Sequence, residues 1–230
     1  KTLILSMEDC NVSIVKFSYN GEVVFPMQKM NKIGQEQAIK CIEKLRPEGN
    51  TNLWDGLQKG LEVMKNNPNT NRNKSLILLT DGVPNVCPPR GHNYMLERFI
   101  AKYNLPCSIH TFGFGYNLDC SLLNDLSSIG RGSYSFIPDS GMVGTVFEHY
   151  FANIMTTMGS NAKIIHKRND IPIFENKIGY INFGQQKTNI ISNFDPKTDT
   201  ILLEYFDFRT GNIVSVKPIM NQSINITNIK

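Results

Sequence analysis

Between residues 12 and 158, short apolar stretches with strand character alternate with stretches of helical periodicity. The clearest strand candidate is the run Ser-Leu-Ile-Leu-Leu-Thr at residues 75–80, which is typical of a parallel strand buried on both faces. The clearest helical stretch is residues 35–45, where four apolar side chains share one face. This alternation predicts an α/β fold in which helices cover both faces of a mostly parallel sheet.

Other elements follow from the same patterns. Asn20-Gly21 is a strong hairpin signal between an expected strand at 12–17 and a second strand at 22–25. A helix is expected from about residue 52, and the remaining pattern predicts helices near 93–103, 119–129 and 140–158, with strands at 108–112 and 133–136.

From Gly159 onward the helical period disappears. Short β-rich stretches are separated there by turns rich in Asn, Asp, Pro and Gly. We therefore predict two domains, an α/β domain at residues 1–158 and a small, mostly antiparallel β-sandwich domain at 159–230.

Two loops of the α/β domain carry residues with ligand chemistry. Thr51 lies at a predicted helix start, where its hydroxyl would occupy an N-cap position, and Asp81 lies at the exit of the 75–80 strand. The carboxyl edge of a parallel sheet is where open α/β folds bind ligands, and a hydroxyl with a carboxylate suits a hard cation such as Mg²⁺. The residues alone leave a simple helix cap and a simple turn open as alternatives.

The chain resembles the von Willebrand factor A (vWA) family. The resemblance rests on residues 12–18, on 49–61 with its T-x-L-x-x-G-L core, on 78–85 with T-D-G-x-P, on 112–115 and on 122–138 with S-I-G-R-G-S-Y-S-F-I. It covers roughly residues 1–158. The tail at 159–230 is similar to the β-domain that follows vWA in intracellular members of the family, some of which also carry a RING or U-box ubiquitin-ligase module.

The resemblance implies a Rossmann-like fold and a metal-ion-dependent adhesion site (MIDAS) built from three loops. Thr51 and Asp81 match the Thr loop and the Asp loop, whereas the first loop, D-x-S-x-S after the first strand, is absent. Residues 1–7 are similar to the end of the helix that follows that strand. We therefore expect the 230 residues to be part of a longer protein, with the first strand and its metal loop upstream of Lys1. Without that strand, two neighbouring strands would keep unpaired backbone groups, and two ligands would hold Mg²⁺ weakly.

The function predicted from these residues is a non-catalytic protein–protein interaction module with a Mg²⁺-dependent MIDAS. Two alternatives stay open: the substrate-recruiting part of a ubiquitin ligase whose RING or U-box lies outside this segment, and a structural scaffold with an inactive metal site. No enzyme is expected, because there is no G-x-S-x-G elbow and the four His are scattered. Residues 87–92 would border any ligand bound at the Asp81 loop, and Arg90 is either a contact for an acidic partner or an exposed loop residue.

Composition narrows the partners and the compartment. A net charge of +4, with Lys and Arg dispersed, predicts no nucleic-acid footprint, and no apolar run is long enough to span a bilayer. The five Cys form no CxxC or Cys/His cluster, which argues against a zinc site and a disulfide framework and favours a cytoplasmic location. A protein partner is expected, while its identity and the oligomeric state are left open.

Overall fold

The computed structural model describes residues 4–5, 7, 10–67, 73–105, 107–207, 209–210 and 212–218. These residues form two compact units, of which the first runs to Ala152 and the second begins at Asn153. Sequence analysis placed the domain boundary six residues later, after residue 158. Of the predicted helix end at residues 1–7, the structure describes Ile4, Leu5 and Met7, and the first two are helical.

The first unit opens with the predicted hairpin. Strand β1 (Asn11–Phe17) pairs antiparallel with β2 (Gly21–Lys29), and Phe17 lies opposite Gly21 at the turn. Helix α2 (Lys32–Lys44) follows, capped by the side chain of Asn31, which accepts a hydrogen bond from Gly34 N at 2.9 Å. The buried side chains of Ile4, Phe25, Met30 and Ala38 form a small core between these elements.

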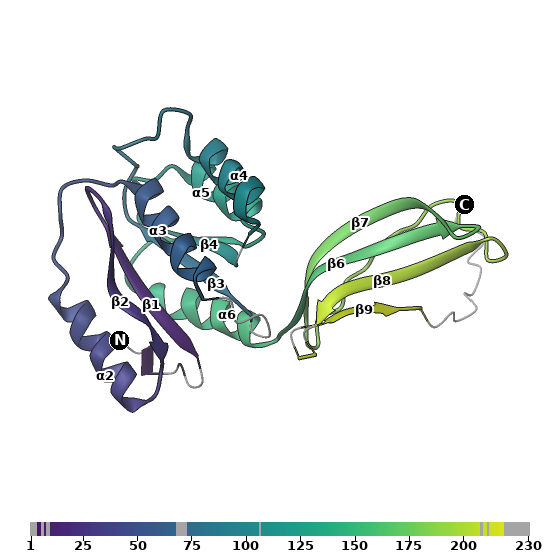
Figure 1. Ribbon diagram of the computed structural model, residues 1–230, viewed down its shortest axis with the longest axis horizontal. Helices are drawn as coiled ribbons and strands as arrows, with labels where there is room; N and C mark the ends of the chain where they lie inside the picture. The colour runs from purple at the N-terminus through teal and green to yellow at the C-terminus, as the bar shows by residue number, and fades with distance from the viewer. Residues whose placement is uncertain are drawn as a thin grey trace. The chain divides into compact units, whose positions relative to one another are not determined.

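A parallel sheet forms the other half of this unit. Its strands are β3 (Ser75–Thr80), β4 (Ser108–Phe114) and β5 (Tyr134–Ile137), in the order β3-β4-β5 with both pairings parallel. Its helices are α3 (Leu53–Lys65), α4 (His92–Tyr103), α5 (Cys120–Ile129) and α6 (Val143–Met155) (Figure 1). The predicted α/β architecture is confirmed.

Alternate residues of β4 face helices on opposite sides of the sheet. Ile109 belongs to the main core, which α3, α4 and α5 build with side chains such as Leu57, Leu96 and Leu123. On the opposite face, Phe112 stacks on Phe147 of α6 with ring centroids 4.8 Å apart. The helices therefore cover both faces of the parallel sheet, as the strand–helix alternation predicts.

Burial on both faces belongs to β4 and not to β3, so the prediction for residues 75–80 is wrong in this respect. In β3, Leu76 and Leu78 are buried in the main core, whereas the side chain of Leu79 is 51% exposed. The reason is position: β4 is the central strand of its sheet, and β3 is an edge strand among the described residues.

The hairpin and the parallel sheet are two separate sheets in the described part of the chain. Helix α3 packs against β1, β2 and β3, so it joins the two sheets (Figure 1). Two glycines allow this close packing: a Cβ on Gly56 would lie 2.6 Å from the Phe17 ring, and one on Gly21 would lie 2.6 Å from the Asp55 carbonyl oxygen. The start of α3 is thereby fixed against the end of β1.

The second unit is an antiparallel sheet. Strands β6 (Thr157–Arg168), β7 (Ile171–Asn182), β8 (Asp199–Asp207) and β9 (Asn212–Val216) are arranged in the order β7-β6-β8-β9. The predicted antiparallel pairing is confirmed. The predicted sandwich is not, because the described residues of this unit form one four-stranded sheet and not two packed layers.

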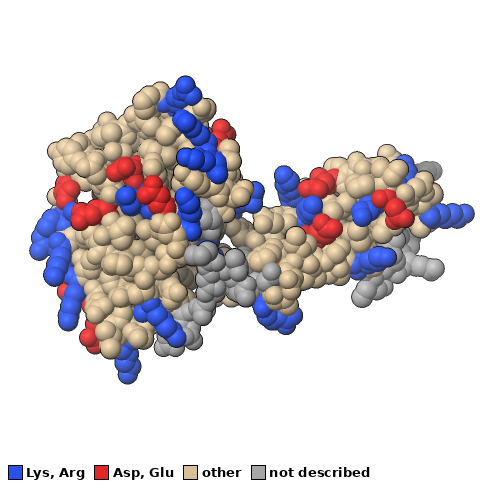
Figure 2. Space-filling view, in the orientation of Figure 1, with Lys and Arg blue, Asp and Glu red and all other residues tan. Residues whose placement is uncertain are grey.

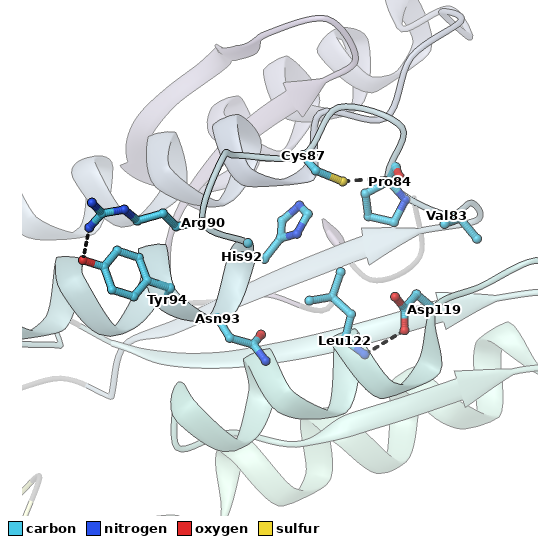
Figure 3. A pocket seen from close by; sticks show the side chains of 10 residues that line it. Val83, Pro84, Cys87, Arg90, His92, Asn93, Tyr94, Asp119 and Leu122 are labelled. Atoms are coloured by element: carbon cyan, nitrogen blue, oxygen red, sulfur yellow. Dashed lines mark hydrogen bonds between the residues drawn. The ribbon is translucent and has the colours of Figure 1, made fainter.

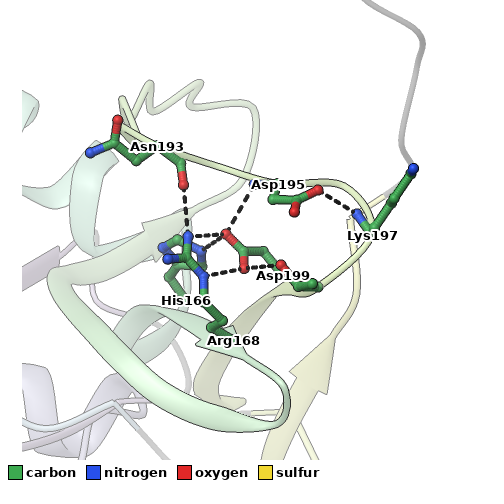
Figure 4. Close-up of polar contacts among 7 residues, drawn as sticks. His166, Arg168, Asn193, Asp195, Lys197 and Asp199 are labelled. Atoms are coloured by element: carbon green, nitrogen blue, oxygen red, sulfur yellow. Dashed lines mark hydrogen bonds and ion pairs between the residues drawn. The ribbon is translucent and has the colours of Figure 1, made fainter.

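A buried ion cluster joins two strands of this sheet to the loop before β8 (Figure 4). The Asp199 side chain has no exposed surface, and its Oδ2 lies 2.8 Å from His166 Nε2. Arg168 donates to both carboxylate oxygens, from Nε at 2.8 Å and from Nη2 at 2.9 Å. The backbone N–H of Asp195 and the hydroxyl of Thr198 donate to the same carboxylate at 3.0 Å each. Arg168 dominates the effect on Asp199 and holds the pKa of this carboxyl far below its usual range.

On the face shown in Figure 2, basic and acidic side chains are interspersed over each unit and do not form one large basic patch. No helix among the described residues is both long and apolar enough to cross a membrane.

Candidate functional site

The Thr51 loop is held by the end of the hairpin. Ser18, which follows β1, is buried, and its carbonyl accepts a hydrogen bond from Asn52 N at 2.8 Å. Asn52 Nδ2 donates to the carbonyl of Tyr19, also at 2.8 Å. The residue that follows Thr51 is therefore fixed to the end of the hairpin before α3 begins, which restricts where Thr51 lies.

Thr51 is not the N-cap of α3, so that part of the sequence prediction is wrong. The N-cap is Asn52, whose side-chain oxygen accepts a hydrogen bond from Asp55 N at 3.3 Å. Asn is as good an N-cap as Thr, and here it stands one residue closer to the helix. The hydroxyl of Thr51 therefore does not cap α3.

The Asp81 loop begins with a tight turn at the carboxyl end of β3. The Thr80 side chain is buried, and its hydroxyl donates to the Gly82 carbonyl at 3.0 Å while accepting from Gly82 N at 3.3 Å. The chain bends directly after the strand, and Asp81, the first residue of the bend, is exposed. The carboxylate is therefore at the sheet edge where sequence analysis predicted it.

Asn85 joins the two loops. Its side-chain oxygen accepts a hydrogen bond from Thr51 N at 2.8 Å, and its Nδ2 donates to Asn50 Oδ1 at 3.3 Å. The loops are also close at a second point, because a Cβ placed on Gly82 would lie 3.8 Å from Thr51 Oγ1. The structure thus brings the Thr51 hydroxyl beside the Asp81-Gly82 peptide, although 30 residues separate them in the chain.

Two oxygen donors at this edge are part of what a hard cation needs. Mg²⁺ takes six oxygen ligands in octahedral geometry and commonly keeps several waters, so a hydroxyl and one carboxylate are suitable partners but few. Within the described ranges there is no group of three or more His, Cys, Asp or Glu side chains that could hold a metal ion. The hydroxyl of Thr51 and the carboxylate of Asp81 are therefore the right type of ligand for a divalent cation, but two protein ligands are fewer than such a site normally has.

The sequence model of the von Willebrand factor type A domain family matches residues 1–149 of this chain. The chain belongs to the von Willebrand factor type A family. An uncharacterized protein of Synechocystis is 27% identical over 158 residues, which are 69% of this chain and 36% of that protein. This chain thus spans about a third of the length of that curated relative.

Solved structures support the same fold. The von Willebrand factor type A protein from Catenulispora acidiphila has a TM-score of 0.69 at 14% identity, covering 94% of this chain and 58% of that one. A coverage of 94% extends beyond the vWA domain into the second unit. Proximal thread matrix protein 1 from the mussel byssus, solved with a zinc-occupied MIDAS motif, has a TM-score of 0.55 at 18% identity and covers 70% of this chain and 42% of that one.

Sequence analysis missed the residues that hold the site together. Asn85 was included in the T-D-G-x-P stretch without a role, and Ser18 was only the end of a strand motif. Both act through partners more than 30 residues away. Of residues 87–92, which were expected to border a ligand at the Asp81 loop, Cys87, Arg90, Gly91 and His92 line a pocket together with Val83 and Pro84.

Proposed function

We propose that the vWA domain is a non-catalytic interaction module that binds a partner protein through a Mg²⁺ ion at the edge of the sheet. Thr51 and Asp81 contribute oxygen ligands, and the remaining protein ligands come from residues upstream of Lys1. A carboxylate of the partner takes one of the remaining coordination positions. Such a contact adds a strong local charge interaction to a broader protein surface.

The observation that carries this proposal is the hydrogen bond from Thr51 N to Asn85 Oδ1 at 2.8 Å. It fixes the Thr51 loop to the Asp81 loop, so that the two oxygen donors are positioned before any ion binds. Preorganised ligands of this kind reduce the cost of ordering a site on binding. The hydrogen bonds of Ser18 and Asn52 hold the same loop from the other side.

A cytoplasmic location is part of the proposal. Cys87 and Cys120 are exposed cysteines that form no disulfide bond within the described residues. Free exposed thiols persist in reducing compartments, where glutathione and thioredoxin prevent disulfide formation. A reducing setting therefore suits this chain.

The test is thermal melting of the full-length protein in Mg²⁺ or Mn²⁺ against EDTA. A ligand at a hundredfold excess over its Kd stabilises by about 2.7 kcal/mol, which raises the melting temperature of a domain of this size by roughly 5–10 °C. Asp81→Asn removes the negative charge of one metal ligand and Thr51→Val removes the oxygen of the other, while both nearly preserve side-chain shape. Both variants are expected to lose most of the metal-dependent rise and to keep the melting temperature measured in EDTA.

The matched control is Asp170→Asn, an exposed carboxylate in the second unit whose φ of 64° Asn adopts readily. It should keep the full metal response. Equal responses of Asp81→Asn and wild type would contradict the proposed site. If neither ion changed the melting temperature of the full-length protein, the proposed metal site would be contradicted. The result would favour the alternative of a structural scaffold with an inactive metal site.

A further inference from the structure

A second candidate site lies beside the Asp81 loop. It is a pocket of about 300 Å³ between the loop after β3 and the N-terminal ends of α4 and α5 (Figure 3). Pro84 and Cys87 form one wall, Leu122 and Asp119 face them, and His92 stands between (Figure 3). The metal proposal uses none of these side chains.

His92 is the most unusual residue of the pocket. Only 6% of its surface is exposed, and its Nε2 is a buried polar atom with no hydrogen-bond partner among the described residues. The ring points into the pocket (Figure 3). A buried polar atom without a partner costs about 1–3 kcal/mol, so a native structure normally supplies that partner from the protein, from water or from a ligand.

The first backbone N–H groups of α4, next to His92, donate no hydrogen bond to the side chain of the N-cap residue. Helix α4 begins at His92, and its N-cap is Gly91, which has a φ of 77° and makes no side-chain capping bond. The first N–H groups of a helix have no partner within the helix, and their partial positive charge attracts anions. The uncapped end of α4 and the His92 ring thus present donors in the same place.

One basic and one acidic side chain lie at this pocket, Arg90 at its rim and Asp119 in its lining. Arg90 lies at the rim, where its Nη1 donates to the Tyr94 hydroxyl at 2.7 Å. Asp119 is the N-cap of α5 and accepts a hydrogen bond from Leu122 N at 2.9 Å, so the positive end of α5 offsets part of its charge. Burial lowers the pKa of His92, and the nearby Asp119 opposes that shift. At neutral pH His92 is therefore a neutral donor or acceptor and not a fixed cation.

We propose that this pocket binds a carboxylate group, with the uncapped N-terminus of α4 and His92 Nε2 as its hydrogen-bond donors. The ligand gives Nε2 the partner that the described residues do not supply, and it places an anion at the N-terminus of α4, where Gly91 has no side chain to act as a cap. The negative charge of Asp119 repels the ligand carboxylate and thereby lowers the affinity of the pocket for it. The site does not depend on a metal at Asp81, and so it stands or falls separately from the proposed function.

Two sources of the carboxylate are compatible with the pocket: a free small carboxylate, or an Asp or Glu side chain of a partner protein. Asn93 also lines the pocket, and its Oδ1 is buried without a hydrogen-bond partner among the described residues. A peptide residue carries an N–H that could donate to such an acceptor, whereas acetate carries none.

The experiment is an NMR titration of the full-length protein in EDTA at constant ionic strength, observing the His92 imidazole and the amides of residues 92–94. The probes are sodium acetate and its neutral isostere acetamide, with sodium chloride as the reference salt. Acetate is expected to shift these resonances in a saturable way, and acetamide is not. Absence of a saturable acetate shift, or equal binding of acetamide, would overturn the proposal.

Two variants should change acetate binding in opposite directions. His92→Phe fills the same space without a donor and should raise the Kd about 10-fold. Asp119→Asn keeps a good N-cap for α5 and removes the opposing charge, so it should lower the Kd about 5-fold. A folding defect can weaken binding but cannot tighten it. Weaker binding by Asp119→Asn would therefore contradict the proposed arrangement.

Two further measurements complete the experiment. One identifies the source of the carboxylate, and the other tests whether its binding is independent of the metal site. N-acetylaspartate methylamide should bind more tightly than acetate if the natural ligand is a partner side chain, and no more tightly if it is a free carboxylate. Exposed His149 gives the matched control His149→Phe, which should leave acetate binding unchanged. Asp81→Asn should also leave it unchanged, so that failure of the metal proposal cannot be mistaken for failure of this one.

Discussion

Replacement of Asp199 by alanine is expected to lower the melting temperature of the second unit by roughly 10 °C. The Asp199 carboxylate accepts hydrogen bonds from Arg168, from Asp195 N and from the Thr198 hydroxyl, and it lies beside His166. Removal of the carboxylate leaves the buried His166 and the backbone of the loop before β8 without their acceptor. Loss of one member of a buried charge cluster is more destabilising than loss of an exposed pair, because the remaining groups stay desolvated.

Two further variants separate charge from shape at this position. Asp199→Asn keeps the size of the side chain but removes its charge, so it should destabilise the unit less than Asp199→Ala and more than the exposed control Asp170→Asn. Differential scanning calorimetry of the full-length protein would resolve the transition of this unit. An Asp199→Ala protein that melts like wild type would show that the cluster contributes no net stability.

The strands and helices of the vWA domain were predictable from sequence because their signals are local. The apolar run at 75–80 and the helical period of residues 35–45 each report one element, and the pairing of β3 with β4 follows from the helix between them. The same local signals misjudged burial. Whether Leu79 is covered depends on which strand is central, and no pattern within residues 75–80 contains that information.

The candidate site was predictable only in part, because its residues follow from local signals but the contacts that position them do not. Thr51 and Asp81 could be found because each stands at the boundary of a recognisable element. The contacts that fix them could not, since Asn85 reaches Thr51 across 34 residues and Ser18 reaches Asn52 through its backbone carbonyl. An Asn in a loop has the same appearance in a sequence whether it bridges two loops or faces water.

The buried histidines show the same limit. Sequence analysis found four scattered His and no site, and spacing alone supports nothing more. Folding places His92 in a pocket where its Nε2 has no hydrogen-bond partner among the described residues, and it gives His166 a carboxylate 33 residues away. These environments arise from tertiary contacts, so the chemistry of each His becomes visible only in the folded chain.

Acidification from about pH 6.5 to pH 4 is expected to destabilise the vWA domain by about 3 kcal/mol through His110 alone. His110 lies on β4 with 8% of its surface exposed, packed edge-on against the Tyr150 ring at 4.9 Å. Burial lowers its pKa to about 4. The backbone N–H of Ser133 donates to Nδ1 at 3.2 Å, so Nδ1 holds a lone pair and Nε2 carries the proton toward Ser108 Oγ at 3.0 Å.

The sign of the effect follows from these contacts. Protonation of Nδ1 would turn the acceptor of the Ser133 N–H into a donor, and it would place a positive charge on a buried ring. The unfolded chain binds this proton near pH 6.5 and the folded chain only near pH 4. The contribution of neutral His110 to stability is therefore fully present above about pH 6.5 and is lost as the pH falls toward 4.

Urea unfolding of the full-length protein at a series of pH values would measure this loss, and His110→Gln should flatten the pH profile of the first unit. His149→Gln, at an exposed position, should not flatten it. The second unit should behave differently over the same interval. Because Arg168 holds the pKa of Asp199 below that of an unfolded Asp, its contribution persists down to about pH 4 and declines only below it. Between pH 6.5 and 4 the free energy of unfolding of the vWA domain should therefore fall more than that of the second unit, and the reverse order of the two changes would contradict both assignments.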